Sequence, residues 1–270
     1  MHCYKNATAL PEISLRDRAF HYGDGCFTTT RIQNGQIELY ALHLARLQDA
    51  VRRLYLQLDW AVLEKSLARL QYDHPQACGT LKIIISRGEG RRGYSLPQQS
   101  ADLWLYYYPS PVEAFKHQTI ESGVLDQAIG LSMPQLVGLK SLNRLEQIML
   151  KHELDQKGWA EALVSDVQGH IVEGVSSNCF IRIKDSWICP ELRYNGVHGV
   201  MRAEILRRMN QHHIRCEIRA VELFELEQVQ SVFFCNALHP MKIAATLNQQ
   251  SLDAQPAADL FQQLQLNQIH

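Results

Sequence analysis

The sequence of 270 residues lacks several patterns that would assign it to a class. Its seven cysteines are scattered, odd in number and without a C-x-x-C pair, which argues against a disulfide framework and a zinc site. No apolar run approaches the roughly 20 residues of a membrane-spanning helix, and no signal peptide opens the chain. With 27 basic and 28 acidic side chains, the net charge is -1, so no basic surface for binding nucleic acid is predicted. We therefore expect a cytoplasmic protein with reduced thiols that binds neither nucleic acid nor membrane.

Several catalytic motifs are also missing. The twelve histidines show no H-E-x-x-H or paired-ligand spacing, so no metal site is predicted. There is no G-x-S-x-G nucleophile elbow. The glycine-rich segment 87–94 matches neither G-x-x-x-x-G-K-[ST] nor a strand-to-helix G-x-G-x-x-G. It is interpreted either as a mobile hairpin or as a carboxylate-binding loop in which Arg91 or Arg92 is the clamp.

Hydrophobic periodicity predicts the elements of both halves. In the first half it indicates helices over 42–58 and 61–71, followed by strands over 79–86 and 103–108. Pro109-Ser-Pro111 ends the second strand and is the best domain boundary. We expect a small α/β domain over residues 1–110 and a larger α+β domain over 118–270.

The second half is predicted to mix helices and strands without regular alternation. A helix is expected directly after Lys140 and another over 199–210. The strands are expected near 161–166, 179–183, 216–220 and 231–235. Because the β-helix-β order of a doubly wound fold is absent, the predicted class is α+β, with mixed or antiparallel sheets and flanking helices.

Three features in the second half suggest a shared chemistry. Lys140 is flanked by apolar residues, an environment in which an amine can lose its proton near neutral pH, although most lysines are solvated surface charges. Glu173 is an isolated acid that taken alone reads as a turn or edge carboxylate. Gly199 opens a helix whose free N–H groups can bind an anion, although a glycine before a helix is common. A lysine, an acid and a helix start in this order are what a protein needs to hold pyridoxal phosphate.

Five motifs place the chain in a known family. They are Asp17-Arg-Ala-Phe-His-Tyr-Gly-Asp-Gly-Cys-Phe27, His43-Leu-Ala-Arg-Leu47, Lys140, Glu173-Gly-Val-Ser-Ser-Asn-Cys-Phe180 and Gly196-Val-His-Gly-Val-Met-Arg202. Together, in this order, they resemble the fold-type IV pyridoxal-phosphate enzymes, which have a two-domain fold like that of D-amino-acid transaminase. The resemblance covers about residues 16–240. It implies pyridoxal 5'-phosphate as the cofactor, a small-molecule substrate and a homodimer.

The resemblance also implies the roles of individual residues. Lys140 is expected to hold the cofactor and to act in catalysis together with Thr29. The cofactor-binding residues implied are Lys140, Arg46, Glu173, Ser176, Val200 and Met201, with Arg46 and the amides of the last two at the phosphate and Glu173 at the ring nitrogen. The substrate-binding residues implied are Arg92, Tyr94, Asn236, Ala237 and Leu238.

Within the family, the sequence is most similar to the aminodeoxychorismate lyases. The similarity lies in Gly23-Asp-Gly-Cys-Phe-Thr-Thr29, in the loop 86–94, in Lys140-Ser-Leu-Asn-Arg-Leu-Glu146 and in Cys235-Asn-Ala-Leu238. It implies conversion of 4-amino-4-deoxychorismate to 4-aminobenzoate and pyruvate in folate synthesis. The alternatives are an aminotransferase of D- or branched-chain amino acids and a catalytically silent protein of the same fold. Leu145 stands where branched-chain aminotransferases have a tyrosine near the ring oxygen, which leaves Asn143 and Arg144 as candidates for that contact.

Overall fold

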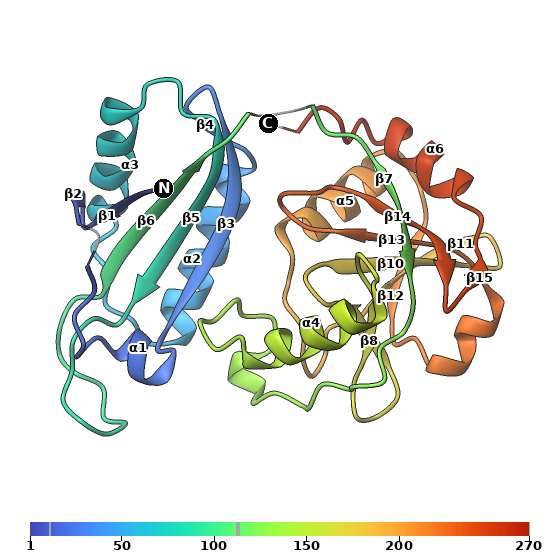
Figure 1. Ribbon diagram of the computed structural model, residues 1–270, viewed down its shortest axis with the longest axis horizontal. Coiled ribbons are helices and arrows are strands. Elements are labelled where there is room, and N and C mark those ends of the chain that lie inside the picture. The colour runs from blue at the N-terminus through green and yellow to red at the C-terminus, as the bar shows by residue number, and fades with distance from the viewer. Residues whose placement is uncertain (11, 112–113, 270) are drawn as a thin grey trace. The chain divides into compact units, whose positions relative to one another are not determined.

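A computed structural model of the chain describes residues 1–10, 12–111 and 114–269. These residues fall into two compact units, each described here by itself (Figure 1). Within the described residues, unit 1 comprises 1–111 and 139–143, and unit 2 comprises 114–138 and 144–269. Residues 112–113, in the interval between the two domains expected from the sequence, and residue 270, at the end of the second, lie outside the described residues.

Unit 1 is built on a six-stranded sheet with the order β2-β1-β6-β5-β3-β4, in which every neighbouring pair is antiparallel. Its strands are β1 (His2–Lys5), β2 (Thr8–Ala9), β3 (Gly25–Gln33), β4 (Gln36–Ile37), β5 (Gly79–Ser86) and β6 (Asp102–Pro109). Its helices are α1 (Arg18–Tyr22), α2 (Tyr40–Arg53) and α3 (Ala61–Asp73). The predicted strands over 79–86 and 103–108 and the predicted helix over 61–71 are confirmed within two residues at each end. The helix predicted over 42–58 is present, but it ends five residues early, at Arg53.

The two faces of this sheet have different roles. Side chains alternate between faces along a strand, and in β5 Leu81, Ile83 and Ile85 are buried while the residues between them are half-buried. The buried face packs against the apolar sides of α2 and α3 (Figure 1). The other face of β3 and β5 carries polar side chains, among them Thr29 and Lys82. Thr29 and Lys82, which are discussed below, therefore lie on the same face of the sheet.

Unit 2 contains a seven-stranded mixed sheet and a separate two-stranded hairpin. The sheet has the order β12-β11-β10-β13-β14-β15, with β7 beside β14; β7 and β14 are parallel, as are β11 and β12. Its strands are β7 (Gln118–Ser122), β10 (Asn178–Ile183), β11 (Ser186–Pro190), β12 (Cys216–Arg219), β13 (Val229–Cys235), β14 (Lys242–Leu247) and β15 (Gln250–Ser251), and the hairpin is β8 (Leu163–Ser165) with β9 (Ile171–Gly174). Its helical segments are η1 (Pro134–Leu136), α4 (Leu145–Lys157), α5 (Val200–Gln211), η2 (Leu223–Gln228) and α6 (Gln255–Gln263). The predicted α+β class, with antiparallel and mixed sheets and flanking helices, is confirmed.

The helix expected directly after Lys140 begins five residues later, at Leu145. Residues 139–143 are extended instead, because their backbone bonds to the start of β3: the N–H of Phe27 donates to the carbonyl of Lys140 (3.0 Å), and the N–H of Leu142 donates to the carbonyl of Gly25 (3.0 Å). This pairing places Lys140 in unit 1. The sequence expectation had grouped it with the second domain.

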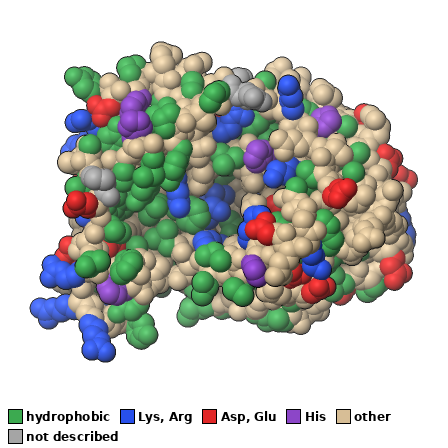
Figure 2. All heavy atoms as spheres, in the orientation of Figure 1, with side chains coloured by type: hydrophobic (Ala, Val, Ile, Leu, Met, Phe, Trp, Pro, Cys, Tyr) green, Lys and Arg blue, Asp and Glu red, His purple; other side chains and the backbone are tan. Residues whose placement is uncertain are grey.

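The charged side chains are of both signs, and the thiols are unpaired. Figure 2 shows basic and acidic side chains interspersed over the face that it draws. All seven cysteines are free, and four of them are buried. Among the helices of the described residues, none combines the length and the apolar character needed to cross a bilayer.

Candidate active site

Lys140 is held against the first residues of β3. Besides the two backbone bonds to that strand, the amide of Asn143 donates to the carbonyl of Gly23 (3.2 Å). Gly25 permits the close approach, since a Cβ there would lie 2.2 Å from the carbonyl oxygen of Ile85. The Lys140 ammonium nitrogen lies 4.7 Å from the centroid of the Phe27 ring. The backbone of the lysine is therefore fixed while its amine projects over an aromatic face.

A second lysine contacts the same aromatic ring, and sequence reasoning missed it. Lys82 of β5 is paired in register with Thr29 of β3, and its ammonium nitrogen also lies 4.7 Å from the Phe27 ring centroid. Burial lowers the pKa of Lys82. Among the residues that the structure describes, Lys82 forms no ion pair with a carboxylate, so this face of unit 1 has an uncompensated positive charge. In the sequence, Lys82 was visible only as a charged residue within a strand rich in β-branched residues. The register between β3 and β5 was needed to place it beside Thr29.

Arg46 is fixed by a buried hydroxyl on the opposite face of β3. Its guanidinium donates to Oγ1 of Thr28 (3.3 Å), and the same Oγ1 lies 2.6 Å from Nδ1 of His43. Burial, assisted by the positive charge of Arg46, lowers the pKa of His43 to about 3, so the imidazole is neutral at physiological pH. A neutral Nδ1 can accept the Thr28 hydroxyl proton, which leaves the oxygen to accept from Arg46. Thr28 and His43 thus orient the arginine that the family resemblance places at the cofactor phosphate.

The neutral His43 predicts a specific loss of stability in acid. Below pH 6.5 the unfolded chain binds a proton at this residue, whereas the folded chain does not until about pH 3. The free energy of unfolding therefore falls as the pH drops through this window, by about 1.4 kcal/mol per pH unit. Between pH 7 and pH 5, we expect urea unfolding to show a loss about 2 kcal/mol larger for the wild type than for His43→Asn. Equal losses in the two proteins would show that His43 is not buried in the neutral form.

Glu173 lies in unit 2, within β9, and is a buried strand residue rather than a turn carboxylate. Its Oε2 accepts hydrogen bonds from the N–H of Val197 (2.9 Å) and from the side-chain amide of Asn178 (3.2 Å). Two donors on one oxygen fix the orientation of the carboxylate. A rigid, buried negative charge of this kind fits a partner that carries a proton, such as a pyridine nitrogen.

The start of α5 fits a phosphate group. Its N-cap residue, Gly199, provides no side-chain cap, so the first N–H groups, including those of Val200 and Met201, have no acceptor within the helix. A Cβ at Gly199 would lie 1.9 Å from the Asn178 side-chain oxygen, so a larger residue there would have to displace Asn178. Free amides and the positive end of the helix dipole favour an anion. Unit 2 therefore has groups suited to a ring nitrogen and a phosphate, and unit 1 has an amine and a guanidinium.

Ser176, implied by the resemblance to bind the cofactor, is hydrogen-bonded to a buried acid that sequence reasoning did not single out. Its hydroxyl donates to Oε2 of Glu161 (2.9 Å), as does the hydroxyl of Ser177 (2.8 Å). The N–H of Val175 donates to Oε1 of the same carboxylate (2.8 Å). Glu161 is fully buried and organises the turn that follows Glu173. An acid at the start of an otherwise apolar strand was its only signal in the sequence.

The predicted substrate-binding residues lie on two surface segments. Arg92 and Tyr94 are exposed on the glycine-rich loop of unit 1. In unit 2, Asn236 forms a turn in which its side-chain oxygen accepts from the N–H of Leu238 (3.0 Å) and of His239 (2.9 Å). The amide of Leu238 is therefore used by the turn itself. The amide of Ala237 has no acceptor among the described residues.

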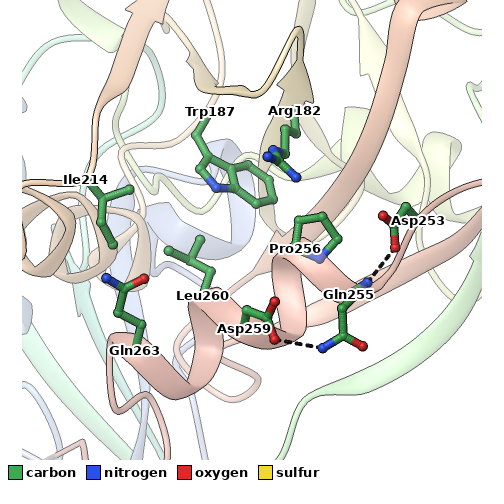
Figure 3. A pocket seen from close by; sticks show the side chains of 9 residues that line it. All are labelled: Arg182, Trp187, Ile214, Asp253, Gln255, Pro256, Asp259, Leu260 and Gln263. Atoms are coloured by element: carbon green, nitrogen blue, oxygen red, sulfur yellow. Dashed lines mark hydrogen bonds between the residues drawn. The ribbon is translucent and has the colours of Figure 1, made fainter.

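A cavity in unit 2 is lined by none of these residues (Figure 3). It has a volume of about 280 Å³ and lies between β10, β11 and α6. Its lining is mixed in character and consists of Arg182, Trp187, Ile214, Asp253, Gln255, Pro256, Asp259, Leu260 and Gln263. It contains none of the predicted site residues, so it is not the candidate active site.

Comparisons with known proteins agree with these features. The family described as amino-transferase class IV matches residues 25–245. Aminodeoxychorismate lyase of Vibrio harveyi is 31% identical over 238 residues, with 86% of each chain covered. D-alanine aminotransferase of Bacillus licheniformis is 25% identical over 230 residues, covering 82% of this chain and 78% of the relative. The crystal structure of 4-amino-4-deoxychorismate lyase from Pseudomonas aeruginosa superposes with a TM-score of 0.87 at 34% identity, covering 97% of this chain and 98% of that one. The chain therefore belongs to the class IV aminotransferase family.

Proposed function

We propose that the protein is a pyridoxal-phosphate-dependent lyase that splits 4-amino-4-deoxychorismate into 4-aminobenzoate and pyruvate, a step of folate synthesis. The observation that carries the proposal is the arrangement of Lys140, Thr29 and Lys82 on one face of unit 1. Lys140 provides an amine for proton transfer, and Thr29 provides a hydroxyl. Lys82 adds a second positive charge, which suits a substrate with two carboxylates. Sequence identity above 30% to two lyases supports the same conclusion.

The roles toward the cofactor follow those that the family resemblance implies. We assign its covalent link to Lys140, its phosphate to Arg46 with the amides of Val200 and Met201, and its ring nitrogen to Glu173. When bound, pyridoxal phosphate supplies an electron sink for the charge left by proton removal. The carboxylate of Glu173 would keep a proton on the ring nitrogen, and Thr28 and His43 hold the guanidinium of Arg46 in place.

The reaction requires one proton to leave the substrate and one to return. The amine of Lys140 accepts the proton from the ring carbon that bears the substrate nitrogen. The bond between the neighbouring carbon and the enolpyruvyl oxygen then breaks, and the ring becomes aromatic. Lys140 or Thr29 returns a proton to the methylene carbon of the leaving group, which gives pyruvate. Arg92 and the turn at Asn236 bind the substrate carboxylates, with the Ala237 amide as a donor.

The test of this function is a product assay. Protein reconstituted with pyridoxal phosphate and given synthetic 4-amino-4-deoxychorismate should release 4-aminobenzoate and pyruvate in equal amounts. The family also contains D-alanine aminotransferases, so the same preparation is given D-alanine and a keto acid. Amino transfer without any aromatic amine would contradict the lyase assignment and favour the aminotransferase.

We further propose that the protein acts as a homodimer in the cytoplasm. Helix α4 exposes three apolar side chains at helical spacing, Leu145 (73% exposed), Ile148 (61%) and Met149 (51%). Such a stripe on a surface helix is suited to contact with a second copy. Sedimentation should give twice the chain mass of 30.9 kDa, and a monomer mass would contradict the dimer. The seven free thiols suit a reducing compartment, which cell fractionation tests.

A further inference from the structure

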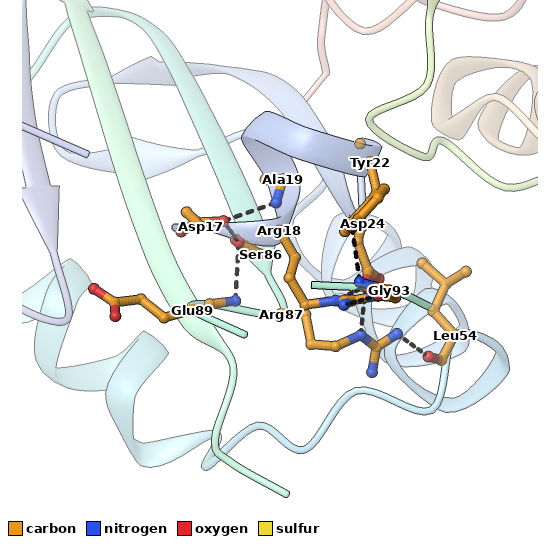
Figure 4. A network of polar contacts seen from close by, with 12 residues as sticks. Asp17, Arg18, Ala19, Tyr22, Asp24, Leu54, Ser86, Arg87, Glu89 and Gly93 are labelled. Carbon is orange, nitrogen blue, oxygen red and sulfur yellow. Dashed lines mark hydrogen bonds and ion pairs between the residues drawn. The ribbon is translucent and has the colours of Figure 1, made fainter. Parts of the chain in front are cut away.

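The glycine-rich loop of unit 1 contacts helix α1 near its start, where the N–H of Arg18 donates to the carbonyl of Gly88 (2.9 Å), and again at Gly93. The N–H of Gly93 donates to the hydroxyl of Tyr22 (3.1 Å), and its carbonyl accepts from the guanidinium of Arg18 (2.8 Å; Figure 4). Both partners belong to α1. Gly93 has φ +103°, a conformation that side chains rarely adopt, so the anchor depends on glycine. The loop is therefore held at a defined point rather than being a free hairpin.

The anchor depends on a buried carboxylate. Oδ2 of Asp24 accepts from Nε of Arg18 (2.8 Å) and from Nε of Arg87 (2.7 Å; Figure 4). Both guanidinium groups are buried, with side-chain exposures of 5% and 6%. Burial alone would raise the pKa of Asp24, but the hydrogen bonds and charges of Arg87 and Arg18 outweigh it and lower the pKa. One carboxylate thus holds two buried cations in fixed positions.

The same carboxylate connects the loop to the end of helix α2. The guanidinium of Arg87 donates to the carbonyls of Leu54 (2.7 Å) and Tyr55 (3.0 Å), which follow α2. These are carbonyls that a helix end leaves without intrahelical partners. Asp24 therefore lies between α2, the helix of His43 and Arg46, and the docked Gly93.

The residues just before the anchor are two cations. Arg91 and Arg92 are both exposed, and within the described part of the chain neither forms an ion pair with a carboxylate. Two unpaired guanidinium groups next to a fixed backbone point suit an anionic group that arrives from solution. On a free loop the same side chains would lose more conformational entropy on binding.

We propose that Asp24 and Tyr22 are positioning residues that hold Gly93, and through it present Arg91 and Arg92 to a carboxylate of the substrate. The substrate part of this proposal rests on the proposed lyase function. The anchoring part does not, because it concerns only the opening of the loop. The two parts are therefore tested by separate measurements.

The anchoring is measured by limited tryptic cleavage of the native protein, with the sites identified by mass spectrometry. Trypsin cuts after Arg91 and Arg92 only when the loop opens, so the cleavage rate reports local opening. Tyr22→Phe removes one hydrogen bond and should speed this cleavage about fivefold. Asp24→Asn leaves two buried guanidinium groups poorly compensated and should speed it by at least about tenfold. If Asp24→Asn does not fold, Tyr22→Phe decides alone, and a rate equal to that of the wild type overturns the anchoring.

Two controls match these changes away from the loop. Tyr72→Phe removes a hydroxyl from a tyrosine that is 82% exposed. Asp49→Asn removes a carboxylate that also pairs with two arginines, Arg52 and Arg53, but is itself 42% exposed. Both controls should cleave within about twofold of the wild type, because exposed pairs contribute little. Acceleration by the controls equal to that in the test variants would overturn the proposal.

The substrate role is measured by steady-state kinetics with 4-amino-4-deoxychorismate. Tyr22→Phe should raise KM about fivefold and leave kcat and the cofactor absorbance unchanged, because it loosens only the carboxylate clamp. Faster cleavage with an unchanged KM overturns the substrate role. A wild-type enzyme that makes no 4-aminobenzoate, while Tyr22→Phe still accelerates cleavage, contradicts the proposed function and supports the anchoring.

Discussion

Replacing Lys140 by alanine is expected to lower the rate of 4-aminobenzoate formation by more than about 10³-fold. The amine of Lys140 is assigned both the covalent attachment of the cofactor and the transfer of the substrate proton, and alanine removes both. The variant should also lose the absorbance of the cofactor bound to a lysine. Absorbance spectra of the reconstituted variant and the product assay measure the two effects independently.

Lys82 provides the matched control, because its amine lies at the same distance from the Phe27 ring as that of Lys140. Lys82→Gln should keep the cofactor absorbance and affect mainly KM, because we assign its charge to the substrate. Lys151→Ala, on the exposed surface of α4, should change neither property. Loss of the absorbance in Lys82→Gln together with its retention in Lys140→Ala would contradict the assignment of the two lysines.

Glu173→Gln is expected to lower kcat by about 10²- to 10³-fold, with a smaller effect on KM. The amide has the size of the carboxylate, and its oxygen can still accept from Val197 and Asn178. It cannot keep a proton on a ring nitrogen, so the substrate carbanion is less well stabilised. Stopped-flow measurement of proton removal tests this step directly, with a substrate deuterated at the ring carbon that bears its nitrogen.

Glu153→Gln controls for the loss of a buried carboxylate as such. Glu153 is buried in unit 2 and also accepts two backbone hydrogen bonds, from Asp126 (2.7 Å) and Gln127 (3.1 Å). Its replacement should change stability but leave kcat within about twofold. A kcat for Glu173→Gln as high as that for Glu153→Gln would show that Glu173 does not act on the cofactor.

Local patterns in the sequence predicted the elements of this fold well. Helices α2 and α3 and strands β5 and β6 were found because their apolar spacing is contained within each segment. The start of α4 was placed too early, since the backbone of 139–143 bonds to β3, more than 100 residues away in the sequence. Periodicity within a window does not report such long-range pairing.

For the candidate site, the sequence predicted only the residues that lie in family motifs. The resemblance provided Lys140, Arg46 and Glu173 because each lies in a recognisable motif. Lys82 required the register between β3 and β5, and the contact between Thr28 and His43 required the packing of α2 on β3. Arg18, Asp24 and Arg87 lie within or beside quoted motifs, but their shared carboxylate appears only when the chain is folded.

The covalent link between Lys140 and pyridoxal phosphate is the central claim, and reductive trapping tests it most directly. The reconstituted protein is treated with borohydride, digested and mapped by mass spectrometry. We expect one pyridoxyl group per chain, on Lys140, in the peptide that contains Ser141 and Leu142. A label on Lys82 or on another lysine, or no label after full reconstitution, would contradict it.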